Sequence, residues 1–334
     1  MAEVAAVRHA DRVLAVLRES DASAAAPATS EIVASWRRCL LNHHLDPERT
    51  DPPILLSGME LRHARDYAGR LLRAADPELD RLHTLVDGLG YSILLADRSG
   101  AIVARRVRDG DEDGCRKWRL WTGALWSEDV EGTNGVGTCL AEQRPVTIHR
   151  DQHFRRRHTQ LTCTVAPVFN AIGQVAGALD VSSFRPDPTG RVLPLIMAAV
   201  RETARRIEKA CFHAFFARHL ILALPEDPDA HSVPLLALDL DRRVVGATHA
   251  ARVALRLDET TLGGSVVLGD LLGAPAPSEP SSFAEAERAV VMGALSQAQG
   301  NVKAAAIALG ISRATLHRKI RSLQLERHHR ARRS

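Results

Sequence analysis

The chain has 334 residues, enough for two or three domains of ordinary size, and 45% of them are hydrophobic, which allows buried cores. Its longest apolar run, near residues 192–200, is interrupted by Pro194 and is too short to span a bilayer, and the charged N-terminus lacks the core of a signal peptide. The five cysteines, an odd count, form no CxxC pair, so the sequence supports neither a disulfide framework nor a zinc finger and favours reduced thiols in a cytoplasm.

The charge of the chain is unevenly distributed. The residues from Ala284 to the C-terminus include ten Lys or Arg and three acids, a net charge of +7, although the whole chain carries only +4. The first 283 residues therefore sum to −3. A basic C-terminal module on a neutral-to-acidic body indicates a polyanionic partner that this module alone contacts.

Residues 1–74 are predicted to form an N-terminal helical region. Apolar residues recur at helical spacing in VLAVLRE and again in EIVASWRRCLL. The prolines of Asp51-Pro52-Pro53 break this pattern, and Ser57 is placed to cap the helix that follows.

Residues 75–223 are predicted to form a domain of strands and flanking helices. The segments 91–107 and 161–183 each hold two β-rich runs around a turn cluster, so each is expected to form a hairpin. A short strand is expected at 145–149, a helix around 134–143 and a long helix over 188–223. This pattern predicts an antiparallel sheet with flanking helices, an α+β domain within a multidomain α+β chain.

Residues 224–282 are expected to form a linker and a small connector. The segments 224–233 and 273–282 are rich in proline with Asp or Ser, which is typical of exposed linkers. Between them the pattern predicts a strand, a turn, a second strand and a helix, and part of this segment, 233–272, resembles a degenerate PAS-like remnant.

Residues 283–325 are predicted to form an all-α helix-turn-helix, followed by a basic tail at 326–334. Gly310 is placed to end one helix in the left-handed conformation, and Ser312 to cap the next. The second helix carries an apolar stripe formed by Leu316, Ile320 and Leu323. Its opposite side is basic and is formed by Arg313, His317, Arg318 and Arg321. A merely solvated basic face does not account for the Leu-Gly-Ile-Ser junction together with the segregated charge. We therefore expect the second helix to read a DNA major groove.

Residues Ala286–Leu325 closely resemble the Fis-type DNA-binding domain of bacterial enhancer-binding activators, most specifically at GN...AA..LGIS..TL.RK. Position by position, the resemblance implies DNA contacts at Asn301, Lys303, Arg313, Thr315, His317, Arg318 and Lys319. By their chemistry, Arg313 and His317 suit base edges, although His317 stands where a longer basic residue is frequent. Phosphate contacts suit Lys303, Arg318 and Arg321.

The stretch LWSEDVEGTNGVGT, at 125–138, looks like a loop that cradles phosphate. However, the order Gly132-x-x-Gly135-x-Gly137 does not match the dinucleotide fingerprint, and no Gly-Lys dipeptide of a Walker loop occurs in the chain. No Lys or Arg lies between Arg119 and Arg144, and the acids of the stretch would repel phosphate. A nucleotide site is therefore not expected, and no nucleophile motif indicates another kind of enzyme.

Residues 30–215 resemble the N-terminal sensor of regulators of the acetoin-operon type, a GAF-like domain. The blocks that carry this resemblance are SWRRCL (35–40), LLADRSGAIV (94–103), WSE…GTNGVGT (126–138), RPVTIHRDQHF (144–154), the segment 161–183 and Arg206-Ile207-Glu208. The resemblance implies that a small molecule binds in a cavity over one face of the sheet.

The candidate effector contacts are Trp126, Thr133, Asn134 and Cys163. The amides at the start of the helix near Asn134 suit a small polar ligand. The alternative is that the glycines permit close packing of this helix on the sheet, with Thr133 or Asn134 as its cap. The tryptophans Trp118, Trp121 and Trp126 suit either an apolar pocket or the core.

No metal or other cofactor is predicted. The residues His149, His153, His158 and Cys163 match no standard metal spacing, and three arginines intervene. Cys139 and Cys163 are candidates for a redox sensor, although buried structural cysteine is the commoner case.

The enhancer-binding activators normally carry an ATPase domain of more than about 200 residues between the sensor and the Fis-type domain, but only about 60 residues separate these parts here. The predicted function is a bacterial transcription regulator that senses a small-molecule effector and binds specific DNA without the AAA+ ATPase and its ATP-driven sigma-54 activation. We expect a cytoplasmic, nucleoid-associated homodimer on a two-fold operator, with no membrane contact. The helices at 188–223 and 284–297 are its candidate dimer surfaces. The alternative is a small-molecule- or redox-responsive adaptor that modulates a partner protein.

Overall fold

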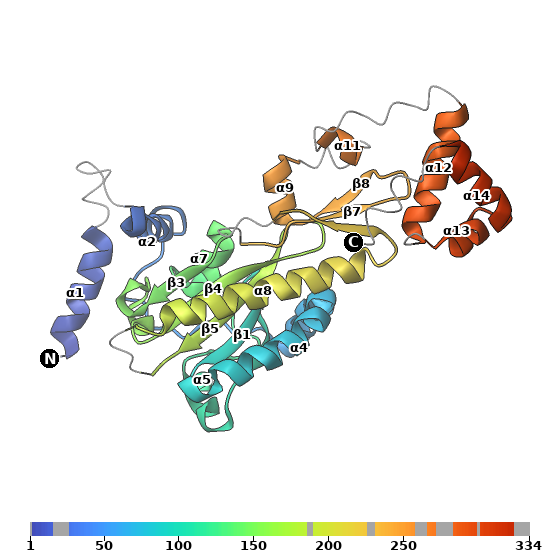
Figure 1. The fold of residues 1–334 in the computed structure, drawn as a ribbon. Coiled ribbons are helices and arrows are strands. Elements are labelled where there is room, and N and C mark those ends of the chain that lie inside the picture. The colour runs from blue at the N-terminus through green and yellow to red at the C-terminus, as the bar shows by residue number, and fades with distance from the viewer. Residues whose placement is uncertain are drawn as a thin grey trace. The chain divides into compact units, whose positions relative to one another are not determined.

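The computed structural model describes residues 2–15, 27–185, 190–225, 231–257, 266–271, 283–298 and 301–323. The chain divides into two compact units, Met1–Val266 and Val267–Ser334 (Figure 1). Among the described helices, none combines the length and the apolar character that crossing a membrane requires.

A five-stranded antiparallel sheet forms the centre of the first unit, with the strand order β2-β1-β5-β4-β3. Its strands are β1 (Ser92–Asp97), β2 (Ile102–Arg106), β3 (Val146–His149), β4 (Thr162–Phe169) and β5 (Val175–Ser183). The two predicted hairpins, β1–β2 and β4–β5, are confirmed by their antiparallel registers. The predicted α+β class and the antiparallel sheet with flanking helices are confirmed as well.

Three helices cover one face of this sheet: α3 (Gly58–Tyr67), α4 (Gly69–Val86) and α8 (Leu193–Phe215). Ser57 and Glu60 form a capping box at the start of α3, which confirms the predicted cap. The buried side of α4 repeats every three or four residues, at Leu71, Ala75, Leu79, Leu82 and Val86. Because this stripe packs on strand residues and on α8, it forms the larger apolar core of the unit.

Shorter helices and turns cover the opposite face of the sheet. The helices there include α5 (Glu112–Lys117), α6 (Glu128–Glu131) and α7 (Gly135–Glu142), of which α7 lies where a helix was predicted. The N-terminal helices are α1 (Ala2–Ala15) and α2 (Pro27–Arg37), the latter continuing as a π-helix over Arg38–Asn42. The short 3₁₀ turns lie at Asp87–Leu89, Asp109–Asp111, Arg150–Gln152 and Arg156–His158.

The long helix α8 ends earlier than the sequence predicts. It stops at Phe215, and Leu220–Ala223 forms strand β6, so the predicted helix is wrong over its last residues. This run of four apolar or small residues pairs with β7 (Leu235–Leu238), which pairs in turn with β8 (Val244–Ala247). A short apolar run does not by its periodicity distinguish a helix from a strand, and here strand pairing decides. The predicted order of strand, turn, strand and helix after residue 233 is confirmed by β7, β8 and α9 (His249–Leu255).

The second unit is helical where it is described. Its helices are α11 (Leu268–Leu271), α12 (Phe283–Gln297), α13 (Val302–Ala308) and α14 (Arg313–Ser322). A small apolar core joins the last three helices and consists of Val291, Ala294, Ala305, Ala306, Leu316 and Ile320. Alanines at the centre of this core let the helices approach closely. The predicted basic tail at 326–334 lies outside the described residues.

The α4 stripe provides a test of the larger core. Leu82 is fully buried, whereas Leu85 of the same helix is 68% exposed. We expect Leu82→Ala to lower the free energy of unfolding by about 2–5 kcal/mol, because it leaves a cavity, and Leu85→Ala to change it by less than about 0.5 kcal/mol. Denaturant unfolding measures both, and equal effects of the two variants would show that this face is not the core.

Candidate DNA interface and sensor site

The turn between α13 and α14 follows from its capping residues. The Asn301 side chain accepts hydrogen bonds from the backbone amides of Lys303 and Ala304, which starts α13. Gly310 has a φ of 63°, and the Ser312 hydroxyl then accepts from the Thr315 amide at the start of α14. The predicted Gly turn and Ser cap are both confirmed, and together they fix the direction in which α14 leaves the turn.

Helix α14 presents a basic side while its apolar side is buried. Leu316 and Ile320 pack in the core of the unit. The exposed residues of the basic side are Arg313, His317, Arg318 and Arg321. Because Arg313, His317 and Arg321 are spaced by four residues, they form one row along the helix. Asn301 and Lys303 are exposed at the start of α13.

Like Asn301, the predicted DNA contacts Lys319 and Thr315 have partners within the protein. Lys319 is partly buried and forms an ion pair with Glu287 of α12. The Thr315 hydroxyl lies 2.8 Å from that of Ser312, so it supports the cap of α14. Lys319 therefore fastens α14 to α12, and the DNA contacts of these two residues stay predictions.

In the sensor, Asn134 is the N-cap of α7. Its Oδ1 accepts from the Gly137 amide at 2.9 Å, and its Nδ2 donates to the carbonyl oxygens of Trp126 and Gly132 at 3.0 and 2.8 Å. Asn134 is only 1% exposed. Both amide hydrogens and the carbonyl oxygen of the side chain are thus bonded within the loop, as the capping alternative predicts.

The three glycines of the loop lie where no side chain fits. Gly132 has a φ of 71°, and a Cβ there would lie 2.5 Å from the ring of Phe154. At Gly135 a Cβ would lie 2.5 Å from that of Cys163, and at Gly137 it would lie 2.5 Å from the backbone nitrogen of Glu128. Such distances are shorter than any packing contact. The glycines therefore allow α7 to pack on the sheet and against its own preceding loop.

A buried polar network joins this loop to the N-terminal helices. Ser35 donates to Glu128 at 2.6 Å and lies 2.7 Å from the hydroxyl of Thr133. Arg38 donates through Nε and Nη2 to the Glu128 carboxylate, at 2.7 and 3.1 Å, and through Nη1 to Glu142. Sequence reasoning missed this network. Its signal was the spacing of Ser35 and Arg38, which places both side chains on one side of a helix.

The other two effector candidates are also buried. The Trp126 indole donates to the carbonyl oxygen of Arg119 at 3.0 Å and lies 4.8 Å from the ring of His158. The Cys163 sulfur is 3.4 Å from Nε2 of His153. With Thr133 and Asn134, these residues surround the start of α7 and the adjoining end of β4. Their contact with an effector stays a prediction.

The same face of the sheet holds a buried carboxyl group that sequence reasoning did not single out. Asp180, in the middle strand β5, is 1% exposed, and both of its oxygens accept from the Ser182 hydroxyl, at 2.9 and 2.6 Å. Burial raises the pKa of Asp180 to about 7. The alternation of β5 places Asp180 beside Ala178 on the face covered by α7.

The thiols of this unit lie in surroundings that disfavour the thiolate. Burial raises the pKa of Cys39 to about 12 and that of Cys211 to about 11, and it also raises the pKa values of Cys139 and Cys163. A reactive cysteine needs a lowered pKa and access to solvent. Within the described part of the chain, no group of three or more His, Cys, Asp or Glu residues is arranged to hold a metal ion.

Comparison with known families agrees with both units. Residues 70–211 match the model of the GAF domain, and residues 282–323 match the model of the bacterial regulatory protein, Fis family. The chain therefore combines a GAF domain with a Fis-type helix-turn-helix domain. Within that class it is related to bacterial regulators of the acetoin-operon type.

Two relatives illustrate this relation. The chain is 37% identical over 238 residues to the acetoin catabolism regulatory protein of Cupriavidus necator, across 70% of this chain. It is 25% identical over 228 residues to the acetoin dehydrogenase operon transcriptional activator AcoR of Bacillus subtilis, across 67% of this chain. Each match spans only 36% of the relative's length.

A solved structure shares the fold of much of the chain. The crystal structure of the E. coli DhaR(N)–DhaL complex aligns with a TM-score of 0.50 and 17% identity, over 72% of this chain and 81% of that one. At this identity the likeness concerns the fold alone.

The packing of the glycine loop gives a prediction about stability. Gly137→Ala places a methyl group against the backbone of Trp126 and Glu128, which cannot move aside without unseating α7. We expect a loss of about 1–3 kcal/mol or more in the free energy of unfolding. Gly88→Ala is the matched control, because a Cβ at Gly88 meets no atom within 4 Å. Thermal and denaturant unfolding of the two variants measures this loss. An unchanged free energy of unfolding for Gly137→Ala would contradict the packing role.

The raised pKa of Asp180 gives a prediction about pH. The folded protein retains this proton up to about pH 7, whereas the unfolded chain releases it near the ordinary value of 3.8. Folding is therefore progressively penalised as pH rises from about 4 to about 7. We expect Asp180→Asn, which cannot ionise, to gain stability relative to the wild type across that window. Unfolding measured from pH 5 to 8 tests this, and a difference that stays constant would refute it.

Proposed function

We propose that the protein is a sequence-specific DNA-binding transcription regulator whose GAF domain senses a small-molecule effector. The observation that supports this most is the basic row of α14, exposed at the start of a capped helix whose other side is buried. A helix held in this way suits the major groove, where its first residues reach base edges. The names of the relatives, which are regulators of acetoin metabolism, support the same class.

The contacts divide by chemistry. Arg313 and His317, in the first half of α14, suit the acceptors of base edges, which Arg binds in bidentate fashion. Phosphate contacts suit Lys303, Arg318 and Arg321, where charge matters more than direction. Asn301, Thr315 and Lys319 complete the set, although Asn301 also caps α13 and the Thr315 hydroxyl contacts the capping Ser312 of α14.

We further propose that two copies bind together in a bacterial cytoplasm. A single short reading helix gains affinity and specificity when two are paired on a two-fold operator. The segment between the matched domains, 212–281, holds the small sheet β6–β8 and α9 and leaves no room for a separate ATPase domain. Regulation on this account needs no ATP hydrolysis and no enzymatic activity.

A double variant tests the reading helix. Arg313→Ala with Arg318→Ala removes one base contact and one phosphate contact without touching the core of the unit. Each base contact contributes about 1–3 kcal/mol, so we expect specific DNA affinity in a mobility-shift assay to fall by tenfold or more. Arg62→Ala with Arg108→Ala removes the same charge from exposed sites of the first unit and should leave DNA binding intact. Unchanged binding by the first variant would falsify the assigned helix.

A further inference from the structure

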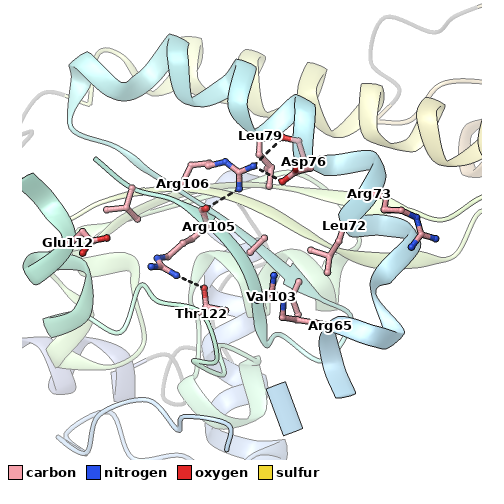
Figure 2. Close-up of a pocket in the computed structure, with 12 residues that line it drawn as sticks. Arg65, Leu72, Arg73, Asp76, Leu79, Val103, Arg105, Arg106, Glu112 and Thr122 are labelled. Atoms are coloured by element: carbon pink, nitrogen blue, oxygen red, sulfur yellow. Dashed lines mark hydrogen bonds and ion pairs between the residues drawn. The ribbon is translucent and has the colours of Figure 1, made fainter. Parts of the chain in front are cut away.

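A cleft of about 530 Å³ lies between the helices α3 and α4 and the edge strand β2 of the sensor (Figure 2). Its lining combines apolar residues of α4 and β2 with four arginines, Arg65, Arg73, Arg105 and Arg106, and with the carboxylates of Asp76 and Glu112. Its size falls in the range of small-molecule sites. None of the four effector candidates near α7 belongs to its lining. The cleft is thus a separate place on the same domain.

The inner wall of the cleft is apolar. Leu79 of α4 and Val103 of β2 are buried members of the larger core, and Leu72 packs against that core. Ala104 and Val107 continue this surface along and beyond the edge strand. A ligand with an apolar body would cover the partly exposed side chains of Leu72, Ala104 and Val107, which water otherwise contacts, and this burial stabilises binding.

The charge of the lining is positive, because four arginines face two carboxylates. Arg106 is neutralised: it donates to Asp76 and Asp80 at 2.6 Å each. Arg105 instead donates to the Thr122 hydroxyl at 3.0 Å and stacks over the Trp121 ring at 3.4 Å. Figure 2 shows these two arginines on opposite sides of the strand.

The other two arginines supply the unpaired charge. Arg65 of α3 and Arg73 of α4 are exposed, and neither has a carboxylate partner among the described residues. Arg105 on the facing strand likewise forms no ion pair with a described residue, so three guanidinium groups of the lining have no carboxylate partner in that part of the chain. Guanidinium groups bind carboxylate and phosphate through paired N–H donors.

We propose that this cleft binds a small organic anion, with its carboxylate or phosphate attracted by the guanidinium groups of Arg65, Arg73 and Arg105 and its apolar body against Leu72 and Ala104. Anion binding to the cleft does not depend on the proposed function. The further statement that this anion is the effector rests on the proposed function, and in that case the effector site lies at α4 and β2.

The experiment uses the full chain and three fluorinated probes of similar shape. They are 4-fluorobenzoate, 4-fluorophenyl phosphate and the neutral 4-fluorobenzamide, and ¹⁹F NMR line broadening reports their binding. We expect one or both anions to broaden and the benzamide to remain sharp. The tighter anion identifies carboxylate or phosphate as the preferred group. Equal broadening by the benzamide, or no broadening by either anion up to solubility, would overturn the proposal.

Variants assign the binding to this cleft. Arg65→Gln with Arg73→Gln removes the two exposed charges and should weaken binding of the preferred anion by about tenfold or more, while the melting temperature stays unchanged. Arg62→Gln is the matched control, an exposed arginine of α3 that does not line the cleft, and should bind as the wild type does. Equal affinity of the double variant and the control would overturn the assignment.

A last variant separates this proposal from the proposed function. Arg313→Ala with Arg318→Ala should keep anion binding in full, because those residues belong to the other unit. If that variant loses the anion signal, the anion binds the basic DNA-reading module and the cleft proposal fails. If anion binding is normal in a wild-type chain that reads no specific DNA, the cleft proposal holds and the proposed regulation fails.

Discussion

The buried carboxylate of Glu128 is the constraint on which the arrangement of the sensor depends. It is 5% exposed and accepts hydrogen bonds from Ser35 and Arg38, which lie about ninety residues earlier in the chain. A buried carboxylate without such partners would cost several kcal/mol. The short helix α6, which begins at Glu128, and the helix that carries Arg38 must therefore dock together. Because the segment after α6 leads to the cap of α7 at Asn134, this contact joins the N-terminal region to the elements that cover the sheet.

Local chemistry was predictable from the sequence. The two hairpins, the cap at Ser57, the left-handed Gly310 and the cap at Ser312 each follow from residues a few positions apart. Distant pairing was not predictable in the same way. The segment of strand β6 was predicted to be the end of a helix, because its own residues do not indicate a strand. It forms a strand because it pairs with β7. The pairing of Arg38 with Glu128 likewise spans ninety residues, and the spacing of Ser35 and Arg38 on one helix does not indicate which distant carboxylate they contact.

The candidate sites show the same difference between local and distant contacts. The basic row of α14 could be predicted because one helix holds all of it, whereas the partner of Lys319 comes from α12. For the sensor, the sequence drew attention to glycines that the structure explains by close packing. The cleft at α4 and β2 draws residues from α3, α4, β2 and the segment after it. No single stretch reveals it, because its arginines become neighbours only when the helices pack on the sheet.

A footprint of the full chain on DNA selected from a random pool, at low and at physiological salt, would show whether the basic module reads a specific sequence. We expect a bounded protected site with two-fold symmetric sequence that persists at physiological salt. Protection spread evenly over all DNA and lost as salt rises would contradict this expectation. That result would leave the basic module as a nonspecific anchor.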